Sequence, residues 1–109
     1  MIEIKTYVDE SGKSHFEDWF NKLNSINAAK IAVAMYRLEQ GNFSNIKGIG
    51  KGVYEYKVHF GPGFRIYFGR DGESIIILLG GGTKRRQQKD IDFAVESWEA
   101  YKARKKKIG

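Results

Sequence analysis

Basic and aromatic side chains alternate on both sides of a Gly-Pro-Gly turn, and their types suit phosphate chemistry. Lys57 and His59 precede the turn, and Arg65 and Tyr67 follow it. Guanidinium and ammonium groups stabilise the charge of a phosphoryl transition state, and an imidazole accepts or donates a proton. The set therefore indicates a surface that binds phosphate, with Arg65 suited to bidentate contact, and it makes His59 a candidate for proton transfer.

These side chains share one face if the segment forms a β-hairpin, because residues two apart on a strand point the same way. With residues 61–63 as the loop, His59 lies opposite Arg65 and Lys57 opposite Tyr67. We expect this polar face to lie away from the face that packs on the helices. The same alternation is also typical of the solvated side of any antiparallel sheet, and a cross-strand partner such as Glu55 would make Arg65 structural.

A second group of cations follows the last predicted strand. Lys84, Arg85 and Arg86 follow three glycines and Thr83, and they open a predicted helix, whose N-terminus favours anions. Together with the hairpin, these side chains form a candidate phosphate-binding surface. The alternative is a basic run that merely flanks a helix.

The charge of the chain is concentrated in its second half. The 109 residues include 19 Lys or Arg and 13 Asp or Glu, a net charge of +6, and residues 1–50 are balanced. A one-sided basic excess favours a polyanionic partner. The chain has no cysteine, and its two histidines, His15 and His59, are far apart, so we expect no disulfide and no metal site.

The hydrophobic pattern predicts one α+β domain over residues 1–109. Strand-like alternation covers residues 2–8, and Ser14 and Glu17 have capping-box spacing before a helix. Asn27 is the predicted cap of a second helix, which ends at Gly41.

The remainder of the chain begins with a glycine-rich loop at residues 41–52. Strands follow at residues 53–60, 64–68 and 75–79, and a helix begins near Lys84. The expected architecture is a small sandwich of order β-α-α-β-β-β-α, in which an antiparallel meander carries the helices on one face.

Three short motifs resemble those of the RelE/ParE superfamily, close to its HigB-like addiction-module killer proteins. They are G-x-G-V-x-E at Gly50 to Glu55, F-G-P-G-F-R-I-Y-F at Phe60 to Phe68, and L-x-G-G-x-K at Leu79 to Lys84 with a downstream K-D-I ending at Ile91. The motifs cover half the chain, and the expected element order agrees over all of it. The resemblance implies a RelE-like fold.

The resemblance implies a toxin of a type II toxin–antitoxin system that cuts mRNA on the ribosome, without metal, through attack of the 2′-hydroxyl. Arg65 then contacts the scissile phosphate, Lys57 is the basic position on the preceding strand, and Lys84 or Arg85 supplies a second cation. RNA binding is expected from Lys51, Tyr67, Arg86 and Lys89.

The implied partners are mRNA, the ribosome and a helix-turn-helix antitoxin, with operator DNA contacted only through the antitoxin. No cofactor is expected. The start of the chain has no apolar targeting segment, and the longest apolar run, Ile75 to Leu79, is far too short to span a membrane, so we expect a cytoplasmic protein without a membrane. Gln87, Gln88 and Lys89 stand where better-known nucleases of the superfamily carry a Tyr or His. Two alternatives therefore stay open, a ParE-like inhibitor of DNA gyrase and a nontoxic, antitoxin-binding corepressor.

Overall fold

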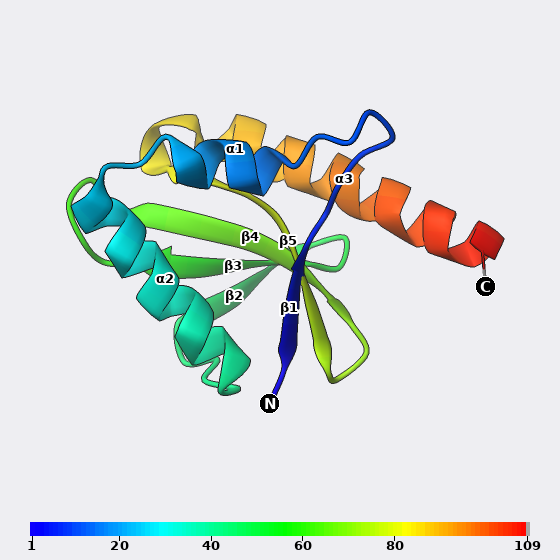
Figure 1. The fold of residues 1–109 in the computed structure, drawn as a ribbon, viewed down its shortest axis with the longest axis horizontal. Helices are drawn as coiled ribbons and strands as arrows, with labels where there is room; N and C mark the ends of the chain where they lie inside the picture. The colour runs from blue at the N-terminus through cyan, green and yellow to red at the C-terminus, as the bar shows by residue number, and fades with distance from the viewer. Residues whose placement is uncertain (109) are drawn as a thin grey trace.

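The chain folds as an α+β domain built on one mixed, five-stranded sheet (Figure 1). The computed structural model describes the backbone of residues 1–108 and the side chains of residues 1–107. In chain order the elements are β1 (Glu3–Thr6), α1 (His15–Asn21), α2 (Ser25–Glu39), β2 (Ile46–Gly50), β3 (Val53–Val58), β4 (Phe64–Asp71), β5 (Ile75–Thr83), the 3₁₀ turn η1 (Lys84–Arg86) and α3 (Gln87–Ile108).

The strand order in the sheet is β1-β5-β4-β3-β2. Strands β3 to β5 form the predicted three-strand antiparallel meander, and β2 extends it by a fourth strand that was not predicted. Strand β1 instead pairs in parallel with β5, so that Glu3 lies opposite Ile75 and Thr6 opposite Leu78. The edge strands are therefore β1 and β2, and β5 lies inside the sheet, as its apolar run predicts.

Helices cover both faces of the sheet, so the prediction that they share one face is wrong. Helices α1 and α2 pack on the face that carries Ile66, Phe68 and Leu78. Ala94 and Trp98 of α3 pack on the opposite face. The physical reason is that β4 and β5 present apolar side chains on both sides, and each side must be covered to leave water. The last turns of α3 extend beyond the sheet (Figure 1).

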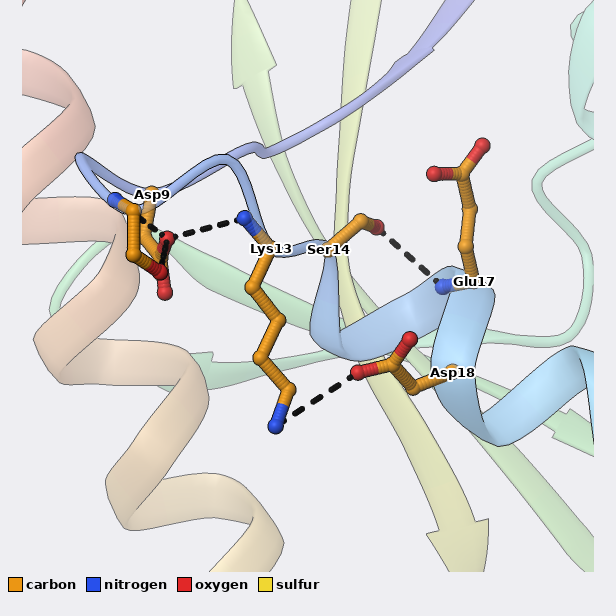
Figure 2. Close-up of polar contacts among 6 residues, drawn as sticks. Asp9, Lys13, Ser14, Glu17 and Asp18 are labelled. Carbon is orange, nitrogen blue, oxygen red and sulfur yellow. Dashed lines mark hydrogen bonds and ion pairs between the residues drawn. The ribbon is translucent and has the colours of Figure 1, made fainter.

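Local signals set the starts of the first two helices. The Ser14 hydroxyl accepts a hydrogen bond from the Glu17 amide at 3.2 Å, which confirms the predicted cap of α1 (Figure 2). The cap of α2 is Asn24 and not Asn27, because the Asn24 side chain accepts from the Asn27 amide at 2.8 Å. Helix α2 ends before Gly41, whose φ of +77° is the predicted left-handed stop.

Strand β2 lies inside the segment that the sequence predicts to be a loop. Ile46 pairs with Tyr56 and Gly48 with Tyr54, and the register then shifts before Gly50 pairs with Val53. The shift and the φ of +102° at Gly50 interrupt the alternation that would otherwise reveal a strand. Backbone pairing with β3, and not side-chain pattern, therefore makes this segment a strand.

Candidate nucleic-acid interface

The hairpin of β3 and β4 brings Lys57 opposite Arg65 and Glu55 opposite Tyr67. The predicted pairing of His59 with Arg65 is wrong by two residues. The reason is that β3 ends at Val58, and the Phe60 amide donates to the Val58 carbonyl at 3.0 Å within a longer loop. A slip of two residues preserves side-chain parity, so Glu55, Arg65 and Tyr67 still share a face.

That face is covered by α3, contrary to the prediction that it points away from the helices. Glu55, Arg65 and Tyr67 are respectively 1%, 8% and 0% exposed. Tyr67 belongs to the apolar cluster that includes Ala94 and Trp98 of α3. The polar side of this hairpin is thus an interior, and its charges need internal partners.

Glu55, Arg65, Tyr67 and Gln87 form a buried group that we call the Glu55 cluster. Arg65 Nε lies 3.1 Å from Glu55 Oε1 as an ion pair, although its N–H has no hydrogen-bond geometry toward that oxygen. Gln87 Nε2, at the start of α3, donates to the same oxygen at 3.2 Å. The cluster therefore joins β3, β4 and α3, and the predicted phosphate ligand Arg65 is engaged with a carboxylate.

Two oxygens of the Glu55 cluster, Glu55 Oε2 and the Tyr67 hydroxyl, have no hydrogen-bond partner among residues 1–107. Burial raises the pKa of Tyr67 well above its ordinary value, and the nearby charges of Glu55 and Asp90 raise it further. Tyr67 accordingly stays a neutral phenol. Because it is fully buried, it contacts no RNA in this conformation, unlike its expected role.

The three glycines at the end of β5 accommodate side chains from both helical layers. A Cβ at Gly81 would lie 2.3 Å from the Trp19 ring, and one at Gly82 would lie 2.1 Å from a carboxylate oxygen of Asp90. Burial raises the pKa of Asp90, while the charges of Arg86 and His15 oppose that rise. The glycines thus serve close packing.

A cleft of about 360 Å³ opens beside these glycines, between α1, the end of β5 and η1. Its charged lining mixes cations with carboxylates, and Lys13 Nζ lies 3.7 Å from Asp18 Oδ2 (Figure 2). The charged or imidazole side chains that line it are Lys13, His15, Asp18, Lys22, Arg86 and Asp90. The mixed signs leave this cleft without a clear preference for an anion.

The predicted cations of the second basic group are all at the surface. Lys84, Arg85 and Arg86 of η1 and Lys89 of α3 are exposed. Thr83, which precedes η1, pairs with Phe64, and Gly82 pairs with Arg65. This arrangement places η1 at the same end of the sheet as Lys57, which is half-buried.

Lys51 lies away from this group. It occupies the turn between β2 and β3 with a φ of +59°, and a Cβ on the next residue, Gly52, would contact Trp98. The six residues of β3 separate this turn from the loop that holds His59, a distance of about 20 Å. The structure therefore divides the predicted RNA-binding residues between two ends of the sheet.

Lys57 and the exposed His59 line a groove of about 310 Å³ beside α2. Lys30 and Arg37 of α2 also line it, and the sequence analysis did not single them out. The available signal was their spacing of seven residues, which returns to the same side of a helix. The apolar stripe of α2, which was the basis for predicting this helix, faces the sheet, so it gives no sign of the cations on the other side.

Neither a metal centre nor a membrane span is found in the part of the chain that the structure describes. Within residues 1–108, no three His, Cys, Asp or Glu side chains gather so that they could hold a metal ion. Over the same residues, no helix combines the length and apolar character needed to cross a bilayer.

Comparison with known proteins gives one informative match. No protein-family model matches the chain. An uncharacterized protein of Haemophilus influenzae (strain KW20 / Rd) is 38% identical to it over 94 residues, which cover 85% of this chain and 89% of that protein. This identity extends over most of both chains, and the protein belongs to the same family as the uncharacterized H. influenzae protein.

Proposed function

We propose that the protein is a type II toxin of the RelE/ParE superfamily, with a RelE-like fold, and that it cleaves mRNA on the ribosome. The observation that carries the proposal is the meeting of two motifs that are distant in sequence. Arg65 of F-G-P-G-F-R-I-Y-F pairs with Gly82 of L-x-G-G-x-K, and Phe64 pairs with Thr83. Lys57, Lys84 and Arg85 then lie at the same end of the sheet.

Cleavage begins when a ribose 2′-hydroxyl loses its proton and its oxygen attacks the adjacent phosphorus. The bond to the 5′-oxygen breaks, and that oxygen takes up a proton. His59, exposed in the loop after β3, is the group assigned to proton transfer. Lys57, Lys84 and Arg85 stabilise the charge that develops on the phosphoryl oxygens.

Arg65 takes a positioning role in this proposal. Its ion pair with Glu55 holds β4 against β3 directly beside Lys57. The catalytic role is therefore tested by substituting the exposed cations on η1 and not Arg65, because removal of a buried, paired charge perturbs the fold.

The test is induced expression of the wild type and of K84A/R85A, with pulse labelling of protein and DNA synthesis and primer extension on a reporter mRNA. We expect the wild type to stop translation and to produce codon-positioned cuts, and the double variant to lose both. The matched control, K102A/K106A, removes the same charge from exposed sites near the end of α3 and should remain toxic. Arrest of translation with intact mRNA would overturn the proposal.

A gyrase inhibitor is the second candidate, and the position of Gln87 favours it. Gln87 lies at the start of α3, where the better-known nucleases carry a Tyr or His, and its amide is bonded to Glu55. In the same experiment, this candidate requires DNA synthesis to stop first while mRNA stays intact. A nontoxic corepressor would instead leave growth unchanged and still bind a helix-turn-helix antitoxin.

A further inference from the structure

The groove beside α2 has a one-sided charge. Its lining includes Lys30 and Arg37 from α2, Lys57 from β3 and His59 from the following loop, together with the amide side chain of Asn45. Among the side chains that the structure describes, no carboxylate lines it. Among the side chains of residues 1–107, none of these three cations forms an ion pair with an acidic group. The groove is therefore an uncompensated positive site, unlike the cleft beside Asp90.

The groove also offers an aromatic surface. Lys30 Nζ lies 4.6 Å from the centroid of the Phe60 ring, and Phe60 is only partly buried. The volume of about 310 Å³ falls at the lower end of the range for small-ligand sites. A phosphate with its attached sugar and base matches both the charge and this size.

We propose that this groove binds one nucleotide of a single-stranded RNA, with Lys30 and Arg37 contacting its phosphate. The identification of the ligand as RNA rests on the proposed function. Lys57 joins the groove to the proposed cleavage site, because it pairs with Arg65, which in turn pairs with Gly82 next to η1. In this proposal, an RNA strand bound beside α2 continues past Lys57 along the end of the sheet toward Lys84.

An acidic polypeptide is the competing occupant, because Val33 and Tyr36 of α2 are also exposed, by 48% and 61%. Only Val33 of these two lines the groove. Lys57 lines the groove and pairs with Arg65 of β4, at the end of the sheet that carries η1. This row of cations from the groove to η1 favours a strand of phosphates over a peptide. The test therefore includes both polyanions.

The experiment measures the affinity of the purified protein for a short, labelled oligouridylate by fluorescence anisotropy over a range of salt concentrations. For single strands, each lost phosphate contact lowers the salt slope by about 0.7, so we expect K30A/R37A to lower it by about 1.4. At 0.1 M salt, this change of slope corresponds to RNA binding about 25-fold weaker in K30A/R37A than in the wild type. Arg37→Lys keeps the charge and should keep the slope.

The matched control is K47A/K106A, which removes two exposed cations outside the groove and should leave the slope unchanged. Circular dichroism of each variant checks that the fold is intact. An unchanged slope in K30A/R37A would overturn the proposal, and so would loss of poly-L-glutamate binding with RNA binding retained. A protein that binds RNA through the groove yet cuts no mRNA would refute only the proposed catalysis.

Discussion

Gln87 Nε2 donates a hydrogen bond to Glu55 Oε1 at 3.2 Å and so fastens the start of α3 to the middle of β3. Glu55 also receives the charge of Arg65. One buried carboxylate therefore aligns the hairpin with the helix that follows η1. Because Gln87 directly follows η1, its hydrogen bond to Glu55 also fixes the position of the exposed cations proposed for catalysis.

Gln87→Ala should lower the free energy of unfolding by about 1–2 kcal/mol, because a part-buried hydrogen bond to a charged group is lost. Urea unfolding of the purified variant measures this change. Gln88 is the matched control, since its amide bonds to Asp92 at an exposed site at 2.9 Å. Gln88→Ala should stay within about 0.5 kcal/mol of the wild type. Equal losses in both variants would contradict the bridging role of Gln87.

Arg65→Ala should destabilise the fold by about 3–5 kcal/mol, because Glu55 would remain buried without its cation. Arg85→Ala, at an exposed site, should cost less than about 0.5 kcal/mol. Thermal and urea unfolding give both values. Replacing the pair with apolar residues, in E55L/R65M, should recover most of the loss. A stable, folded Arg65→Ala protein would instead mean that the ion pair contributes little.

Gly69→Ala should destabilise the protein by about 1–3 kcal/mol through overpacking. A Cβ there would lie 2.4 Å from the Trp98 ring, whereas at Gly48 the nearest atom is a Tyr54 ring carbon at 3.8 Å. Both glycines lie on strands and lack a positive φ. Gly48→Ala therefore controls for backbone effects and should be tolerated. Similar unfolding midpoints for the two variants would contradict the close approach of Trp98.

Protonation of the Asp71 carboxylate should contribute to the loss of stability in acid. Hydrogen bonds from Lys105 and Tyr101 hold the pKa of Asp71 below its ordinary value of 3.8. Because the folded pKa is lower than the unfolded one, the stabilisation is complete above the unfolded pKa and is lost as the pH falls through the folded value. Asp71→Asn should therefore be less stable than the wild type at pH 7, with a gap that narrows below about pH 4. Urea unfolding across this range tests it, and a gap that is constant with pH would contradict the assignment.

Side-chain alternation predicted which residues of the hairpin share a face, but not what covers that face. The parity of Glu55, Arg65 and Tyr67 survived a two-residue error in register because strands have a period of two. The apolar stripe of α3 was evident, yet β4 and β5 are apolar on both sides, so pattern alone does not assign the helix to one of them. The partnership of Glu55 with Arg65 was an open alternative, and the structure selects it.

The groove beside α2 could not be predicted from the sequence, for a different reason. Lys30 and Arg37 precede Lys57 by at least twenty positions, and only the tertiary packing of α2 beside the end of β3 brings them to one groove. The strand β2 was missed because its evidence lies in backbone pairing interrupted by a bulge. Such features depend on contacts between distant segments, which periodicity does not report.

The parallel pairing of β1 with β5 also sets the order in which the protein can be completed during synthesis. Glu3 finds its strand partner at Ile75, and both helical layers contact β5. A nascent chain that ends before residue 75 therefore has no strand to receive β1. The closing of so long a loop is slow compared with local helix formation. The sheet can be completed only after β5 has left the ribosome, so translation products that end before residue 75 lack both the partner of β1 and Lys84.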